Sequence, residues 1–344
     1  MSKVREIENT KAPSTKLPQS RAGATSALGK IKPYIAIARP DHWVKNVFMA
    51  LGVLLAYFFH PELLGIDSIF QIFWAFATTC LLASSNYVLN EILDAPTDQK
   101  HPTKRRRPIP SGQVNVSIAY AEWIVLGSIG LAMATAVNPP FFLSSAFLLF
   151  MGVVYNVRPI RSKDVAYVDV LSESINNPIR LLLGWFALTQ NEIPPVSLLI
   201  SYWMIGAFLM AAKRFAEYRS IANVAVVVAY RPSFKHYDEQ KLLISMFFYT
   251  ICFAVFFGVF IVRWHLELIL FVPFVAGFVS YYLHIAFKQE SAAQHPEKLH
   301  RETGLVAYSV ICLFAFVLLM LVDIPKIYSL LDMPLSRITP LWKL

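Results

Sequence analysis

The chain has 344 residues, of which 56% are apolar and only 15% are charged, and its mean hydropathy is +0.51. Soluble domains usually carry about 25% charged residues, so this composition excludes an ordinary soluble protein and predicts an integral membrane protein. The net charge of +9 reflects where the loops lie and does not indicate nucleic acid. We expect the lipid bilayer, and no nucleic acid, among the partners.

Apolar stretches long enough to cross a bilayer recur along the chain. A spanning helix needs about 20 residues, with about 17 near the lower limit. The stretches lie at 43–59, 69–89, 118–136, 139–155, 165–188, 196–212, 242–262, 266–287 and 304–322. The fourth is the weakest because it is short and begins with Pro139 and Pro140. We therefore predict an all-α integral membrane protein, a bundle of nine transmembrane helices.

Basic residues are distributed unevenly between the loops. Most of the 31 Lys and Arg residues precede the first stretch or lie in alternate connections, whereas the connections at 60–68, 137–138 and 189–195 hold none. Short loops rich in Lys and Arg remain in the cytosol. We expect a cytosolic N-terminus, an extracytoplasmic C-terminus and a location in the cell inner (cytoplasmic) membrane, with motif loops and active site on the cytosolic side.

The chain divides into one membrane domain and two tails. Residues 1–32 are rich in Ser, Thr, Lys and Ala and lack an apolar run, which predicts a disordered cytosolic tail without a secretory signal peptide. Residues 33–325 form the membrane domain, and 326–344 a short extracytoplasmic tail. The cysteines fall inside predicted spans without metal or disulfide spacing, so we interpret them as small buried hydrophobes; they are Cys80, Cys252 and Cys312.

An acidic cluster follows the second stretch. Asn90, Asp94 and Asp98 are four residues apart, with Glu91 beside them, so a helix presents them on one side. We expect Pro96 to break this helix, which would place Asp98 in the following turn. Converging carboxylates suit Mg²⁺, which prefers oxygen ligands and often binds through one or two carboxylates plus substrate phosphates. The alternative is that these residues only cap a loop.

Polar residues also share one stripe of the fifth stretch. Asp169, Glu173, Asn176, Asn177 and Arg180 recur every three or four residues in an otherwise apolar segment. Ionisable groups within a bilayer are costly and usually face a bundle interior or a wet cavity. The stripe predicts a polar site, with Arg180 and Glu173 as a deep pair; alternatively, this pair only ties helices together.

Basic residues gather near two predicted membrane edges. The run Lys104–Arg107 either contacts phosphate or only obeys the positive-inside rule. Lys213 and Arg214 either bind a substrate or snorkel to the interface. Glu217, four residues after Lys213, is suited to an ordinary helix ion pair.

The pattern N-E-x-x-D-x-x-x-D at 90–98 resembles the N-D-x-x-D-x-x-x-D signature of the UbiA superfamily of intramembrane prenyltransferases. The resemblance covers about residues 33–322 and includes the number of spans and the cytosolic motif loops. It implies that the motif holds the Mg²⁺ that binds a substrate diphosphate, with Glu91 in place of the usual Asp. The implied metal ligands are Asn90, Glu91, Asp94 and Asp98.

Further motifs indicate a branch of that superfamily. Aromatic prenyltransferases usually carry a second Asp-rich motif after the sixth span, but this chain has Lys213, Arg214 and Glu217 there and no D-x-x-x-D. That segment is similar to the K-R-x-x-E stretch of the decaprenyl-phosphate phosphoribosyltransferase branch. Three other patches resemble the same branch: RPDHWVKN at 39–46, HPTKRRRPIPSG at 101–112 and HPEKLHRE at 295–302.

One spacing departs from that branch. Lys163 and Asp169 keep the expected six-residue step, but Tyr155 precedes Lys163 by eight residues instead of five. The extra residues lie within NVRPIRSK. The departure leaves open a sister group with another donor or acceptor.

The resemblance implies a Mg²⁺-dependent membrane transferase that moves 5-phosphoribosyl from phosphoribosyl diphosphate to polyprenyl phosphate and releases diphosphate. Its partners would be a polyprenyl lipid and a phosphorylated small-molecule donor. The expected catalytic residues are Asp94, Asp98, Lys163 and Asp169. The expected substrate-binding residues are Lys45, Asn90, Arg107, Tyr155, Asn177, Arg180, Lys213 and Arg214.

Two other functions remain open. The first is a prenyltransferase that moves a prenyl group from a prenyl diphosphate to an aromatic or other small acceptor, although the missing second motif argues against it. The second is a membrane transporter whose intramembrane charges line a substrate path. Against transport, the acidic cluster lies at the cytosolic edge and no inverted repeat is evident. Mg²⁺-dependent product formation would exclude a transport-only role.

Overall fold

The computed structural model describes residues 27–101, 103–220, 227–228, 231–288, 291–294, 299 and 301–331. Most of the two predicted tails, and most of the HPEKLHRE stretch, therefore lie outside the described residues. The described chain is helical, and eight of its helices are long and apolar enough to cross a membrane. The protein is thus an integral membrane protein, and each of these helices corresponds to a predicted stretch.

The spanning segments follow in chain order. The first, Lys30–Phe59, contains most of α1 (Ala27–Ala38), η1 (Pro40–Met49) and α2 (Ala50–Phe59). Next come α3 (Ile66–Asp98), α4 (Val116–Thr135), α5 (Pro139–Asn156), α8 (Val196–Arg219) and α10 (Glu239–Trp264). The last two are Leu266–Ala286, made of η6 (Leu266–Phe271) and α11 (Val272–Ala286), and α12 (Thr303–Leu321). Short elements join them: η2 (Pro61–Leu63), η3 (Lys104–Arg106), η4 (Ser162–Asp164), η5 (Pro232–His236), η7 (Ala292–Gln294) and α13 (Pro325–Leu331).

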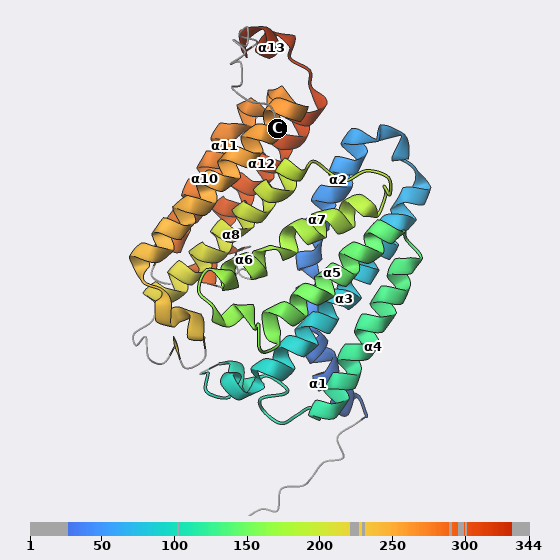
Figure 1. Cartoon of the computed structure of the whole chain (residues 1–344), viewed down its shortest axis with the longest axis vertical. Helices are drawn as coiled ribbons and strands as arrows, with labels where there is room; N and C mark the ends of the chain where they lie inside the picture. The colour runs from blue at the N-terminus through green and yellow to red at the C-terminus, as the bar shows by residue number, and fades with distance from the viewer. Residues whose placement is uncertain are drawn as a thin grey trace, which may run out of the picture.

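The predicted fifth span differs from the prediction, because it is divided into α6 (Val168–Ser174) and α7 (Asn176–Phe186). Pro178 explains the division: it has no N–H to donate to the Ser174 carbonyl, and its ring crowds that carbonyl. The two helices together carry the chain between the ends of the bundle (Figure 1). Eight full-length spanning helices and one broken crossing therefore replace the nine predicted continuous helices among the described residues.

The bundle has two ends that differ in character. We call the end where α3, α5 and α8 finish the polar end, and the other the opposite end (Figure 1). Helix α7 packs against α2, α3, α5 and α8, so the polar stripe faces the bundle interior as predicted. Large apolar side chains such as Phe73, Phe247 and Phe314 are exposed on the outside, where lipid would cover them.

Helix α3 also corrects a prediction. Pro96 lies inside the helix, which continues to Asp98, so the proline does not break it. Because Pro96 is in the last turn, the helix loses one hydrogen bond close to its end, and Gln99 N still donates to Ala95 O. Asp94 and Asp98 consequently lie one helical turn apart on the same face.

Two glycines allow α2 and α7 to approach closely. A Cβ added at Gly184 would lie 1.9 Å from the carbonyl oxygen of Met49, and one at Gly52 would lie 2.0 Å from that of Leu181. Small residues at helix contacts in membranes permit such backbone approach. This contact fixes α7 against η1 and α2, and thereby sets the position of Arg180, one turn before Gly184.

Gly184→Ala is expected to reduce the yield of folded protein and to lower its Tm, because the methyl group meets backbone that cannot rotate away. Gly258→Ala in α10 is the matched control, since a Cβ there has no heavy atom within 4 Å. The control should keep or raise the Tm, because alanine favours helix over glycine by about 1 kcal/mol. Equal Tm values for both variants in a thermal melt would contradict the close contact.

Candidate functional site

Asp94 is the centre of a charged cluster where α3, α5 and the following loop meet at the polar end. Its Oδ1 accepts hydrogen bonds from Lys163 Nζ at 2.5 Å and from Arg161 Nη2 at 2.9 Å. Lys163 also donates to Asn156 Oδ1 at 2.7 Å, and the same oxygen accepts from Asn90 Nδ2 at 2.6 Å. We call these five residues the Asp94 cluster. Because two cations share one carboxylate oxygen, the cluster has an excess of positive charge that suits a phosphate ligand.

Asp98 and Glu91 are tied to the loop that follows α3. Asp98 Oδ2 lies 2.6 Å from Arg107 Nη1. Glu91 is 4% exposed, and its Oε1 accepts from the backbone N–H of Ile109 at 3.2 Å. The Glu91 carboxylate is therefore buried against loop backbone, which contradicts the prediction that it is a metal ligand.

The predicted four-residue metal set is not assembled. Within the described ranges, no three His, Cys, Asp or Glu side chains gather in a way that could hold a metal ion. Asp94 and Asp98, one turn apart, still fit Mg²⁺, which often takes only one or two carboxylates and completes its shell with phosphates and water. Asn90 donates to Asn156 and supports the Asp94 cluster from the same helix face.

The altered Tyr155–Lys163 spacing does not separate the two side chains. Lys163 Nζ lies 5.6 Å from the centroid of the Tyr155 ring, within cation–π range. The loop between them turns at Arg161, whose φ of 31° is left-handed, and this turn brings the Arg161 guanidinium to Asp94 and Asp164. Burial lowers the pKa of Lys163, and the Asp94 carboxylate opposes that change.

A second charged cluster joins α6 to α8. Arg214 is fully buried; its Nε donates to Asp169 Oδ2 at 2.9 Å and its Nη2 to Glu173 Oε2 at 2.6 Å. Tyr155 OH also donates to Glu173 Oε2, at 3.2 Å, and Tyr237 OH donates to Asp169 Oδ1 at 2.5 Å. We call these five residues the Arg214 cluster.

Two residues of this cluster that were expected in the substrate site are fully buried. Asp169 is 0% exposed and accepts from Arg214, Tyr237 and, at 3.4 Å, Ser233. Asp169 was predicted as catalytic and Arg214 as substrate-binding, but neither side chain is accessible to a substrate. Arg214 also does not snorkel; it positions Asp169 and Glu173 within the bundle.

Other cations surround the two clusters. Lys213 Nζ lies 3.9 Å from Glu173 Oε1, and Arg231 Nη1 lies 3.1 Å from Glu217 Oε2. Burial, together with the charge of Arg231, lowers the pKa of Lys104 to about 8. An anion bound among these cations would favour their charged forms.

The predicted Glu173–Arg180 pair is wrong. Arg180 Nε donates to Asn46 Oδ1 at 3.0 Å and Nη1 to the carbonyl of Asn176 at 3.2 Å, whereas Glu173 pairs with Arg214. The amide of Asn177 packs instead against α8, where a Cβ on Gly206 would come within 2.4 Å of its Nδ2.

Lys45 and several further residues also lie near the polar end or contact the site residues. Lys45 lies half-buried on η1, next in sequence to the fully buried Asn46. The sequence did not single out the other partners as site residues, although Asn46 lies in the RPDHWVKN patch and Asn156 and Arg161 lie in NVRPIRSK. These partners are Asn46, Asn156, Arg161, Arg231 and Tyr237.

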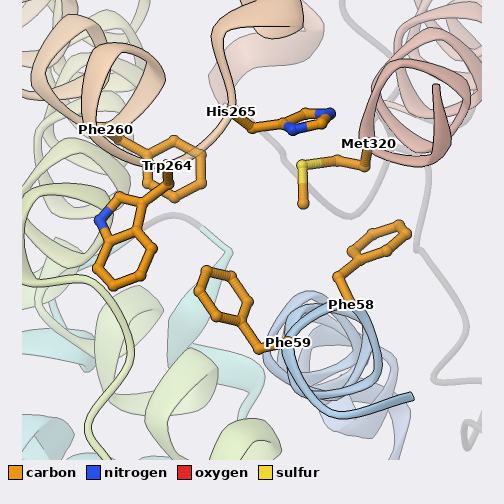
Figure 2. A pocket seen from close by; sticks show the side chains of 6 residues that line it. All are labelled: Phe58, Phe59, Phe260, Trp264, His265 and Met320. Carbon is orange, nitrogen blue, oxygen red and sulfur yellow. The ribbon is translucent and has the colours of Figure 1, made fainter. Parts of the chain in front are cut away.

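A cavity at the opposite end has a different character. It encloses about 170 Å³ and is lined by Phe58, Phe59, Phe260, Trp264, His265 and Met320 (Figure 2). Figure 2 shows aromatic side chains from α2 and α10 pointing into it, with His265 at the edge. A mostly apolar lining does not suit phosphorylated substrates, so the candidate site remains at the polar end.

Most of the chain matches a known protein family. A sequence model described as the UbiA prenyltransferase family matches residues 46–306. The decaprenyl-phosphate phosphoribosyltransferase of Mycobacterium tuberculosis is 32% identical over 205 residues, which cover 59% of this chain and 65% of that protein. The protein of the same name from Mycolicibacterium smegmatis is 29% identical over 212 residues, 60% of this chain and 63% of that protein. The matched region thus spans less than two thirds of either relative.

A solved structure shares the fold. The structure of a UbiA homolog from Archaeoglobus fulgidus bound to GPP and Mg²⁺ has a TM-score of 0.62 at 17% identity. The match covers 86% of this chain and 99% of that one. At this identity the comparison establishes the arrangement of helices.

Proposed function

This chain belongs to the UbiA prenyltransferase family, and from that premise we propose that it is a Mg²⁺-dependent transferase of 5-phosphoribosyl groups to polyprenyl phosphate. The observation that carries the proposal is that carboxylates and cations from several elements gather at one end of the bundle. Asp94 and Asp98 on α3 contact Lys163, Arg161 and Arg107. Lys213 and Arg231, in and after α8, contact Glu173 and Glu217.

This mixture of carboxylates and cations fits two phosphorylated substrates. A single carboxylate pair suffices for the metal on one diphosphate, and a second anionic substrate needs cations in place of a second acidic motif. The names of the mycobacterial relatives, at 29% and 32% identity, support the same substrate class. The basic residues at the polar end favour a cytosolic site.

The reaction is a substitution at the anomeric carbon. A phosphate oxygen of the lipid forms a bond to that carbon, the bond from the carbon to the diphosphate oxygen breaks, and diphosphate leaves with the electron pair. Because the lipid phosphate is already ionised, no general base is required. Asp94 and Asp98 would hold Mg²⁺, which neutralises the leaving diphosphate when bound. Lys163 and Lys213 would hold the anionic groups in line.

The test uses purified protein with labelled phosphoribosyl diphosphate, with and without polyprenyl phosphate. We expect a labelled lipid that requires both the lipid and Mg²⁺ and that is absent after EDTA treatment. Restoring excess Mg²⁺ should restore the product, which separates metal removal from irreversible unfolding. Product from a prenyl diphosphate and an aromatic acceptor, with none from phosphoribosyl diphosphate, would reject the proposal and identify a prenyltransferase.

A further inference from the structure

Arg180 is a buried cation that has no carboxylate partner among the described residues. Arg180 is on α7 and is only 9% exposed. Its guanidinium donates two hydrogen bonds to neutral oxygens, Asn46 Oδ1 and the Asn176 carbonyl. Among the described residues, no Asp or Glu lies within 4.0 Å of its guanidinium. The arginine is therefore oriented by its neighbours but not neutralised.

Arg214, which is also buried, is different. Arg214 contacts both Asp169 and Glu173, so its charge is compensated inside the protein. Arginine does not lose its proton in proteins, so Arg180 cannot become neutral by deprotonation. A buried, unpaired charge within a membrane protein is costly and typically marks a binding site or pathway. An anionic ligand would supply the missing charge.

The surroundings of Arg180 are arranged for such a ligand. Asn46 is 0% exposed, and its Nδ2 donates to Cys80 Sγ at 3.3 Å, which turns its Oδ1 toward Arg180. Among the described residues, Arg180 Nη2 makes no hydrogen bond, so this nitrogen remains available as a donor.

We infer that Arg180, oriented by Asn46, forms a subsite for a phosphate monoester inside the bundle. A guanidinium suits the oxygens of that dianion. The inference rests on the proposed function, in which two substrates carry such a group: the polyprenyl phosphate through its head group and the donor through its 5-phosphate. Arg180 contacts Asn46 and the Asn176 carbonyl, and among the described residues it has no hydrogen bond or ion pair with a residue of the Asp94 cluster.

Binding of two short probes distinguishes the two sources. Farnesyl phosphate and ribose 5-phosphate are each compared with their uncharged counterparts, farnesol and ribose, on full-length protein in nanodiscs. In one of the two pairs, the wild-type protein should bind the phosphate form at least about tenfold more tightly. Arg180→Gln should remove that preference, and Arg263→Gln, an exposed arginine at the opposite end, should retain it.

Asn46→Asp provides a test that does not depend on losing a side chain. A carboxylate beside Arg180 Nε would neutralise the arginine from within, so this variant should have a higher Tm and yet lose the preference for phosphate. If Arg180 only ties helices together, Asn46→Asp would strengthen the tie and leave ligand binding unchanged.

The results separate the inference from the proposed function. Loss of preference for farnesyl phosphate assigns the subsite to the lipid, and loss for ribose 5-phosphate assigns it to the donor. No preference in the wild-type protein, or an unchanged preference in both Arg180→Gln and Asn46→Asp, would overturn the subsite. Turnover of the wild-type protein, measured in parallel, reports on the proposed function alone.

Discussion

Asp94→Asn is expected to abolish turnover while the protein remains folded. The substitution removes a charge that the metal requires, and a metal ion can contribute several kcal/mol to the transition state, so the rate should fall by roughly a hundredfold or more. The amide keeps the shape of the side chain and one oxygen that can accept from Lys163 or Arg161. Rate of lipid product formation and Tm should be measured on the same preparation.

Asp164→Asn is the matched control. Asp164 lies 3.0 Å from the same Arg161 guanidinium and belongs to the same loop, but it is not part of the proposed metal pair. We expect this variant to keep most of the wild-type rate. Full activity of Asp94→Asn, or equal losses in the two variants, would refute the metal assignment.

Arg214→Gln is expected to cause the largest loss of stability. The change leaves Asp169 buried without its cation, and breaking a buried pair in this way typically costs about 3–5 kcal/mol. Arg219→Gln is the control: the side chains of Arg219 and its partner Glu239 are 34% and 47% exposed, so the pair should contribute about 1 kcal/mol or less. Denaturation in detergent, followed by a tryptophan signal, would compare the two free energies of unfolding.

A double variant tests whether the cost arises from the orphaned carboxylate. Arg214→Gln combined with Asp169→Asn removes both charges, so part of the lost stability should return. If the double variant is as unstable as the two single changes added together, the residues do not interact energetically as described.

The sequence contained the main elements of the fold and of one half of the site. Apolar length identified the spanning helices, and the resemblance to the UbiA superfamily is confirmed by the family match. The four-residue spacing of Asp94 and Asp98 puts them on one face of α3, as helix geometry requires, but the prediction had placed Asp98 in the turn after the helix. Pro96 was misjudged because a proline in the last turn removes a hydrogen bond where few remain to be lost.

The sequence did not predict which side chains on different helices pair with one another. The stripe on α6 and α7 correctly placed Glu173 and Arg180 on an interior face, but Pro178 divides that face. Glu173 then meets Arg214 of α8, and Arg180 meets Asn46 of η1, which lies 134 residues away in the chain. Such pairs depend on how the helices cross. The contribution of Arg161 likewise depends on a left-handed turn that no residue type in the loop specifies.

The glycine contact between α2 and α7 has a mechanical consequence. Because backbone touches backbone at Gly52 and Gly184, the two helices have little freedom to slide or tilt separately, and they should move as one rigid unit. Asn46 and Arg180 lie on the two parts of this unit, close to the glycine contact, so their hydrogen bond should persist when the other helices of the bundle move. The polyprenyl lipid of the proposed function would therefore have to enter between helices other than α2 and α7.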